Sequence, residues 1–567
     1  MAQGTIRPIS ERAYFMVFRE LFDLDALPYR LLVLFTQFGS LILLNRIACR
    51  LTGSAAGGLL AAMLWCSNSV LFWPMSWTSA YNQILCAFTL LLALFLFIRY
   101  TETGNRKYNY WQWVVFLLGF GVLEENVVYP ALTLAYAFFF ARNYLRSALW
   151  LTPASIVYAS AHHYFAKASH EGVYAVELGA KTLPALLQYW ILSLWPEKLS
   201  TFVSVPQGLA ISVVALLSAA FAAYLFLKGR NQPCALFGIA WFLVSVAPYL
   251  LVPNHVSEYY LTVPTIGLAL FASIALLTSW KEGFASRTFA VLLTAIHVVP
   301  SGYSAWISCQ KVRMDSTQIK SLVFGVDQLK GKKRNQNIFL EGIDDQLFTY
   351  AFFHHPFRLV GIHRIYLTPE NAVSLAPWDG MTDFSEYALP AAAILRSIET
   401  GTGVVLRFAN HQLIDTTNSY TARLRERVKE AGPPTRIDPG SELFDPYLTS
   451  GWYQAEARHR WMSQRAVFTI GGLSGGGLST PGHILHLTCS CAEVQQRDAP
   501  FRLSVTINGK QLPTVQIPQC GSALEFKFPI PEGGGNKMEV VLALDKVSKL
   551  DFDKRLLGLA IQRIEVR

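Results

Sequence analysis

The stretch GFGVLEENVVYPALTLAY, residues 119–136, holds two adjacent carboxylates, Glu124 and Glu125, inside an otherwise apolar run. A carboxylate at membrane depth must face a water-filled cavity, a partner charge or a substrate, so this placement predicts a functional site. The alternative is that the pair marks the outer end of one membrane segment, with Tyr129 and Pro130 in a turn at headgroup level. The first interpretation makes both glutamates candidates for lining an outward cavity.

The composition predicts a membrane protein with soluble domains attached. Of the 567 residues, 52% are hydrophobic and 15% are charged, which is too apolar for a soluble enzyme of this length. The apolar runs all lie before about Ser308. The formal charge of +10 does not indicate a nucleic-acid partner, because the basic residues mark membrane topology.

Apolar length and polar breaks predict about ten membrane segments. They are residues 29–48, 55–75, 81–99, 110–122, 127–141, 148–165, 208–227, 234–252, 259–280 and 288–308. The segments around Glu124 are short for straight crossings, which favours bent or partly re-entrant helices. Residues 184–196, PALLQYWILSLWP, predict a helix that lies on or dips into the outer leaflet rather than crossing it.

The basic residues between these segments fix the predicted orientation. Alternating directions place eleven on one side, which is then cytoplasmic, and three on the other. The eleven are Arg46, Arg50, Arg99, Arg106, Lys107, Arg142, Arg146, Lys228, Arg230, Lys281 and Arg287, and the three are Lys167, Lys181 and Lys198. Both ends of the chain are therefore expected outside, on the periplasmic side.

Residues 1–28 predict an amphipathic outer-loop segment and not a signal peptide, because they contain no uninterrupted apolar core. An outer amino terminus without a preceding hydrophobic segment leads us to expect a missing upstream helix, from a late start codon or a degraded gene copy. The acidic residues of this segment are expected on a solvated helix face. They are Glu11, Glu20, Asp23 and Asp25.

Three stretches carry a resemblance to a known family: Arg7 and Pro8 with residues 18–54, GVLEENVVYPALTL at 121–134, and LVPNHVSEYYLTVPTIGLAL at 251–270. Together they resemble membrane glycosyltransferases of the GT-C type that use polyprenol-linked sugars, and the transmembrane O-mannosyltransferase group. Leu123, Glu124 and Glu125 stand at that group's Ser-Lys-Glu segment, without its basic member. Glu258, Tyr260, Leu261 and Pro264 match its outward loop, where Tyr259 replaces an arginine.

The resemblance implies a bacterial inner-membrane enzyme that moves a sugar from a polyprenyl phosphate to a periplasmic glycan, lipid or protein. Its catalytic base would be an acidic residue in the first outer loop, before the start of this chain. The catalytic residue is therefore unassigned, and an inactive chain is consistent with this. The alternative is a non-catalytic membrane scaffold or glycan-binding subunit derived from such an enzyme.

The outer loops supply the remaining membrane-face candidates. Glu124, Glu125, His255, Glu258 and Tyr259 are expected to line one outward cavity. Cations at an outer mouth suit an anionic leaving group, which makes Lys167 and Lys181 candidates for the donor phosphate. No cofactor is predicted, and no metal either, because the loop histidines His162, His163 and His170, with Glu171, have no defined ligand geometry.

Residues 309–435 alternate short apolar strands (337–340, 364–367 and 404–408) with helical stretches such as 316–329, and so predict a small α/β domain. No phosphate-binding glycine loop follows any of these strands, which argues against a nucleotide-sugar site. The donor would have to be lipid-linked.

Residues 436–567 predict an antiparallel β-sandwich from short alternating segments and Gly or Pro turns. Its first part gathers Trp452, Tyr453 and Trp461, which either stack against sugar rings or form a core cluster at the domain seam. A disulfide between Cys520 and either Cys489 or Cys491 is allowed outside the cytoplasm and would leave one thiol.

Overall fold

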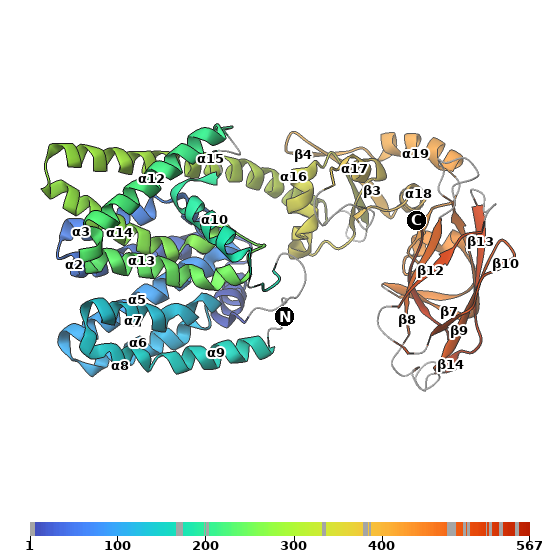
Figure 1. Ribbon diagram of the computed structural model, residues 1–567. Helices are drawn as coiled ribbons and strands as arrows, with labels where there is room; N and C mark the ends of the chain where they lie inside the picture. The colour runs from blue at the N-terminus through green and yellow to red at the C-terminus, as the bar shows by residue number, and fades with distance from the viewer. Residues whose placement is uncertain are drawn as a thin grey trace. The chain divides into compact units, whose positions relative to one another are not determined.

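The computed structural model divides the chain into two compact units, a helical unit, Met1–Val312, and a C-terminal unit, Arg313–Arg567 (Figure 1). The structure describes all residues except 1–5, 166–173, 178, 198, 200–202, 331–335, 378–383, 385–386, 432, 457, 473–482, 492–494, 496–498, 518, 521–523, 532–536 and 550–554.

The described part of the helical unit consists of helices and short helical turns. Its α-helices are α1 (Tyr14–Phe22), α2 (Ala26–Thr52), α3 (Ala55–Cys66), α4 (Phe72–Ser76), α5 (Tyr81–Thr103), α6 (Arg106–Gly119), α7 (Tyr129–Phe140), α8 (Leu145–Leu149), α9 (Thr152–Phe165), α10 (Thr182–Leu194), α12 (Gln207–Leu227), α13 (Pro233–Val246), α14 (Pro264–Lys281) and α15 (Phe284–Lys330). The turns that matter for the site are η1 (Pro8–Ala13), η4 (Glu124–Val128), η7 (Ala247–Leu251) and η8 (Glu258–Leu261).

Six of these helices are long and apolar enough to cross a membrane, and α3 with the following turn and α4 makes a seventh if that bent pair is one crossing. The chain is thus a multi-pass membrane protein by its apolar helices. The seven coincide with seven of the ten predicted segments. The other three form α6, α7 and α9, with 14, 12 and 14 residues, shorter than the roughly 20 that a straight crossing needs. Residues 184–196 lie mostly in α10, which has 13 residues and is also too short.

Local sequence signals explain where several helices begin. The side chain of Asp25 caps α2 by accepting a hydrogen bond from the Leu27 amide at 3.0 Å. Asn105 caps α6 in the same way, through the Lys107 amide at 3.0 Å. Proline stands in the first turn of α7, α13 and α14, where no helical N–H is lost.

Small residues let the membrane helices α13 and α14 approach closely. A Cβ atom on Gly238 would lie 2.6 Å from the Gly267 carbonyl oxygen, so neither position tolerates a side chain. Two indole N–H groups fasten the same region, from Trp241 to the Val263 carbonyl and from Trp65 to the Thr262 carbonyl, both at 2.9 Å. These contacts fix η8, which precedes α14, against the bundle.

The first sheet of the C-terminal unit confirms the predicted α/β character. It has the order β2-β1-β3-β4, in which the first three strands are parallel and β4 is antiparallel to β3. The strands are β1 (Asn337–Glu341), β2 (Ile365–Leu367), β3 (Gly403–Ala409) and β4 (Gln412–Asp415), and the helices beside them are α16 (Asp345–Phe348), α17 (Pro369–Ser374), α18 (Ala391–Glu399) and α19 (Thr417–Ala431). The end of α15 packs into the core of this sheet through Leu322, Val323 and Val326.

The second sheet is antiparallel, as predicted, but it is one curled half-barrel and not a two-sheet sandwich (Figure 1). Its strands are β5 (Arg436–Ile437), β6 (Leu448–Glu456), β7 (His459–Gly471), β8 (Ile484–Ser490), β9 (Phe501–Ile507), β10 (Lys510–Gln511), β11 (Val515–Ile517), β12 (Leu524–Pro529), β13 (Lys537–Leu544) and β16 (Ala560–Val566), and a separate pair is formed by β14 (Ser548–Lys549) and β15 (Leu556–Leu557). Strand β16 pairs with both β7 and β8 and so joins the strands that two sheets would separate. The alternation that we used specifies only which face is buried, and it is the same in both architectures.

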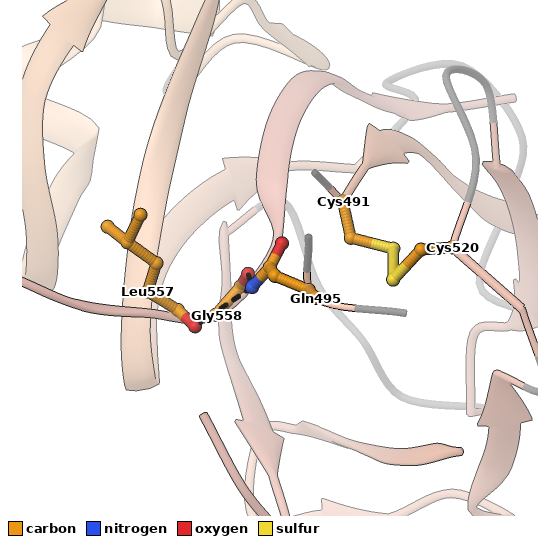
Figure 2. Close-up of a disulfide and its surroundings, with 5 residues drawn as sticks. All are labelled: Cys491, Gln495, Cys520, Leu557 and Gly558. Carbon is orange, nitrogen blue, oxygen red and sulfur yellow. Dashed lines mark hydrogen bonds between the residues drawn. A yellow bond between two sulfur atoms is a disulfide. The ribbon is translucent and has the colours of Figure 1, made fainter. Parts of the chain in front are cut away.

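Figure 2 shows the disulfide of the half-barrel, which joins Cys491 to Cys520 and leaves Cys489 as a buried thiol. Of the two predicted pairings, the structure therefore selects Cys491. Beside it, the Gln495 side chain donates hydrogen bonds to the carbonyls of Leu557 and Gly558, at 3.2 and 3.1 Å. A disulfide is consistent with an extracytoplasmic domain.

Candidate functional site

The amino-terminal segment docks against the loop that carries the two glutamates. The Ile9 amide donates to the Gly121 carbonyl at 2.8 Å, and the Ser10 hydroxyl donates to the Val122 carbonyl at 2.6 Å. A Cβ atom on Gly121 would lie 2.8 Å from the end of the Ile9 side chain, so the close approach depends on glycine. Residues about 110 positions apart in sequence thus form one surface.

This docking places a cation against Glu124. The Arg7 Nε atom lies 2.8 Å from Glu124 Oε2 and 3.0 Å from Oε1, and Arg7 Nη1 lies 2.7 Å from Glu11 Oε1. His162, on α9, approaches from the other side, with Nε2 at 3.7 Å from Glu124 Oε1. That distance is too long for a hydrogen bond. We call Arg7, Glu11, Glu124 and His162 the charged cluster.

The surroundings keep Glu124 ionised. Burial raises the pKa of this carboxyl, but the contacts with His162 and Arg7 outweigh burial and hold the pKa below its ordinary value. About a quarter of the Glu124 side chain remains exposed, so a small molecule can reach it. The charged cluster therefore presents an accessible carboxylate between two basic side chains.

Glu125 has the opposite environment. Its side chain is buried, its Oε2 atom accepts a hydrogen bond from the Tyr249 hydroxyl at 2.6 Å, and its Oε1 atom has no partner among the described residues. Burial raises the pKa of Glu125 to about 8, so the carboxyl is largely protonated at neutral pH. The environments of these adjacent glutamates thus shift their pKa values in opposite directions, because one is paired with Arg7 and the other is desolvated.

Aromatic rings connect Glu125 to the second predicted group of residues. Tyr249 stacks on Tyr260 with ring centroids 4.2 Å apart, and Tyr260 meets His255 edge to face at 5.8 Å. The His255 Nε2 atom lies 3.3 Å from the Tyr259 hydroxyl, and the Tyr174 ring packs on His255 at 4.4 Å. We call Tyr174, Tyr249, His255, Tyr259 and Tyr260 the aromatic cluster.

The aromatic and charged clusters adjoin. Burial and Tyr259 raise the pKa of the Tyr174 hydroxyl, whereas the charge of Arg7 lowers it, so Arg7 lies within electrostatic range of Tyr174. Glu258 is buried at the start of η8 and makes contacts of its own. The structure thus brings Glu124, Glu125, His255 and Tyr259 into one region, and a shared substrate cavity there stays a prediction.

The two predicted phosphate-binding lysines differ in their outcome. Lys181 donates to Glu177 Oε2 at 3.1 Å and to Asn254 Oδ1 at 3.0 Å, so its ammonium group is already partnered at an exposed position. Lys167 lies outside the described residues, as do His170 and Glu171. The described residues contain no group of three or more His, Cys, Asp or Glu side chains arranged to hold a metal ion.

The predicted stacking residues lie at the start of the half-barrel with their polar atoms engaged. The Trp452 indole donates to the Val467 carbonyl at 2.9 Å, and the Tyr453 hydroxyl donates to the Leu556 carbonyl at 2.9 Å. Trp461 packs edge to face on His459 at 5.6 Å. All three are half-buried, and sugar stacking on them remains a prediction.

The sequence predicts no site role for Arg7, Tyr249 or Tyr260, and it predicts that Glu11 lies on a solvated face. Glu11 instead pairs with Arg7, whereas Glu20, Asp23 and Asp25 are exposed as expected. Arg7 gave little signal, because it is one of several charged residues in an amphipathic segment. The tyrosines gave no signal, because tyrosine is common in membrane-interface belts.

No protein-family model matches this sequence, and no curated protein matches it significantly.

Proposed function

We propose that this protein is a membrane glycosyltransferase that moves a sugar from a polyprenyl-phosphate donor to a glycan, lipid or protein acceptor outside the cytoplasm. The observation that carries the proposal is the Glu124 carboxylate held between Arg7 and His162 beside the buried Glu125. A carboxylate base next to cations is what transfer from a lipid phosphate requires. The resemblance of residues 121–134 and 251–270 to GT-C enzymes supports the same reaction class.

In this proposal Glu124 accepts the proton of the acceptor hydroxyl as its oxygen bonds to the anomeric carbon of the sugar. The bond from that carbon to the phosphate oxygen breaks, and polyprenyl phosphate leaves with the electron pair. Arg7 and Lys181 supply positive charge for the leaving phosphate, because cations stabilise charge that develops there. In this proposal Glu124 takes the role that the resemblance gives to an acidic residue of the first outer loop.

The proposal includes the finer topology. The short helices α6, α7 and α9 are bent or partly re-entrant segments that bring the number of membrane segments to ten. The C-terminal unit lies in the periplasm of a bacterial cell, where the Cys491–Cys520 disulfide is stable. With this topology the acceptor binds on the same side of the membrane as the charged cluster.

The test is transfer of radiolabelled sugar from a polyprenyl phosphate by the full-length protein in lipid nanodiscs, with membrane extract as the source of acceptor. We expect Glu124→Gln to lower the rate by about 10²- to 10⁴-fold, the usual contribution of a general base. Glu102→Gln is the matched control, because Glu102 also pairs with two arginines but lies at the end of α5. A labelled donor that stays untouched by the wild-type protein would contradict the proposal.

A second candidate is a non-catalytic membrane scaffold or glycan-binding subunit. The observation that favours it is that Arg7 already satisfies two carboxylates, as expected of a structural clasp between the amino-terminal segment and the bundle. In that case the wild-type protein would bind glycans and transfer no sugar. The transfer assay, run beside a glycan-binding measurement, therefore separates the two candidates.

A further inference from the structure

The C-terminal unit contains a cavity of about 630 Å³ at the carboxyl ends of its three parallel strands. The chain leaves β1 to form β2 on one side and returns to form β3 on the other, which makes the end of β1 a topological switch point. In open α/β sheets, ligands bind in the crevice outside the carboxyl ends of the strands at such a point. The last residues of β1 and β3 and the residues that directly follow β1 and β2 line this cavity.

The charged lining is mainly acidic. It consists of Glu341, Asp344, Asp345 and Glu370, opposed by Arg407. Two of these carboxylates are held by Thr416 and by residues of α19, which do not themselves line the cavity. Glu341 accepts from the Thr416 hydroxyl at 3.1 Å and from Arg423 at 3.3 Å. Glu370 accepts from the Tyr420 hydroxyl at 2.9 Å and pairs with Arg427.

The two aspartates are fixed by backbone amides. Asp344 accepts from the Leu347 amide, and Asp345 accepts from the Ala376 amide, both at 2.8 Å. Each carboxylate has a second oxygen or further lone pairs that these bonds do not use. The lining is thus a rigid set of hydrogen-bond acceptors, which is how a recognition site is preorganised.

An independent observation points to a ligand in this cavity. Thr368 follows β2, lines the cavity and is completely buried, yet its hydroxyl Oγ1 has no partner among the described residues. Buried hydroxyls are almost always hydrogen-bonded in folded proteins. A polar group entering the cavity would supply the missing partner.

The charge of the lining selects the class of ligand. The four carboxylates outnumber the three arginines beside them, Arg407, Arg423 and Arg427, so the lining keeps a net negative charge that disfavours a nucleotide or a sugar phosphate. The described residues hold no metal-binding group here either. Carboxylates and a buried hydroxyl suit a ligand with many hydroxyl donors and no charge.

We propose that this cavity binds a neutral saccharide, with carboxylates such as Glu341 and Glu370 accepting from its hydroxyls and Thr368 Oγ1 bonding to a group that enters deepest. This site is separate from the charged cluster and does not depend on the proposed transfer reaction. It is also distinct from the predicted stacking residues of the half-barrel. The proposal therefore holds whether or not those residues bind a sugar.

The experiment measures binding of neutral disaccharides of glucose, galactose, mannose and N-acetylglucosamine to the full chain in lipid nanodiscs, by calorimetry and saturation-transfer NMR. Nanodiscs avoid glycoside detergents, which would compete. We expect at least one disaccharide to bind and Thr368→Val to weaken it about tenfold, because the variant keeps the shape and removes only the hydroxyl. Glu370→Gln should weaken binding as well.

The control is Glu399→Gln, which removes a carboxylate from an exposed ion pair with Arg425 in the same unit. It should leave binding unchanged. The proposal is overturned if no disaccharide binds at millimolar concentration, or if a sugar phosphate binds more tightly. It is also overturned if Thr368→Val and Glu370→Gln both bind like the wild type. Thermal unfolding of both variants shows that a loss of binding is not a loss of fold.

Discussion

Arg7 and Glu124 lie 117 positions apart in the sequence, yet their side chains form an ion pair with Nε 2.8 Å from Oε2. This contact supplies the cation that the sequence around Glu124 lacks. It also makes the amino-terminal segment part of the helical bundle and not a free outer loop. The charged cluster therefore depends on a long-range docking event.

We expect Arg7→Ala to destabilise the helical unit. The Glu124 carboxylate would lose its main partner while remaining mostly desolvated, which costs about 1–3 kcal/mol for a hydrogen bond to a charged group. Thermal unfolding in detergent should show a lower Tm. Arg12→Ala is the matched control, because Arg12 is exposed in the same turn.

A double-mutant cycle isolates the pair itself. Arg7→Ala combined with Glu124→Gln should cost less than the sum of the two single changes, because each removes the same interaction. Strictly additive effects would show that the ion pair contributes nothing and that Arg7 acts only by packing.

The fold was predictable where a signal is local. Apolar length located all seven helices or bent pairs that can cross a membrane, a short apolar run located β1, and period-two alternation located β9. The half-barrel was not predictable, because its closure depends on β16 pairing with both β7 and β8, and alternation does not encode pairing order. Apolar length does not distinguish a straight crossing from a bent or re-entrant segment, and three of the ten predicted membrane segments form helices too short for a straight crossing.

The sequence predicts the carboxylates of the site. It does not predict the residues with which they interact. Glu124 and Glu125 stand out because charge is rare in an apolar run. The pKa of Glu124 is lowered by its contacts with His162 and Arg7, and the pKa of Glu125 is raised by burial, and both effects come from elements far away in the sequence. Such contacts leave no pattern in a single sequence.

Gly119→Ala should destabilise the turn that presents the glutamates. A Cβ atom there would collide with the Asn126 side chain, which is buried and donates to the Phe116 carbonyl at 2.9 Å. We expect a loss of roughly 1–3 kcal/mol from overpacking, measured as a lower Tm. Gly302→Ala in α15 is the control, since nothing lies within 4 Å of its added methyl and alanine favours a helix. A Tm unchanged in Gly119→Ala would contradict the packing described here.

Glu125→Gln should change how stability depends on pH. Below about pH 4.5 the wild-type carboxyl is protonated in both the folded and the unfolded chain, and between pH 4.5 and 8 the unfolded chain alone releases the proton. The folded chain then binds more protons, so this group makes wild-type stability fall as pH rises, by at most about 1.4 kcal/mol per pH unit. The stability advantage of Glu125→Gln over the wild type should therefore grow from pH 5 to 8 and level off above. Parallel stability curves would show that Glu125 is ionised in the folded protein, and Glu20→Gln at an exposed site is the control.

The Cys491–Cys520 disulfide gives a prediction about both stability and location. It closes a loop with a sequence separation of 29, so replacing both cysteines by serine should destabilise the half-barrel by about 2–4 kcal/mol. Thiol titration of the denatured, non-reduced protein should find six free cysteines of the eight present, including the buried Cys489. Cys489→Ser should lower that count to five and leave the disulfide intact.

Because disulfides persist outside the reducing cytoplasm, the full chain expressed in a bacterial membrane should show the bond without added oxidant. Eight free thiols in protein isolated under thiol-blocking conditions would instead place the C-terminal unit on the cytoplasmic side.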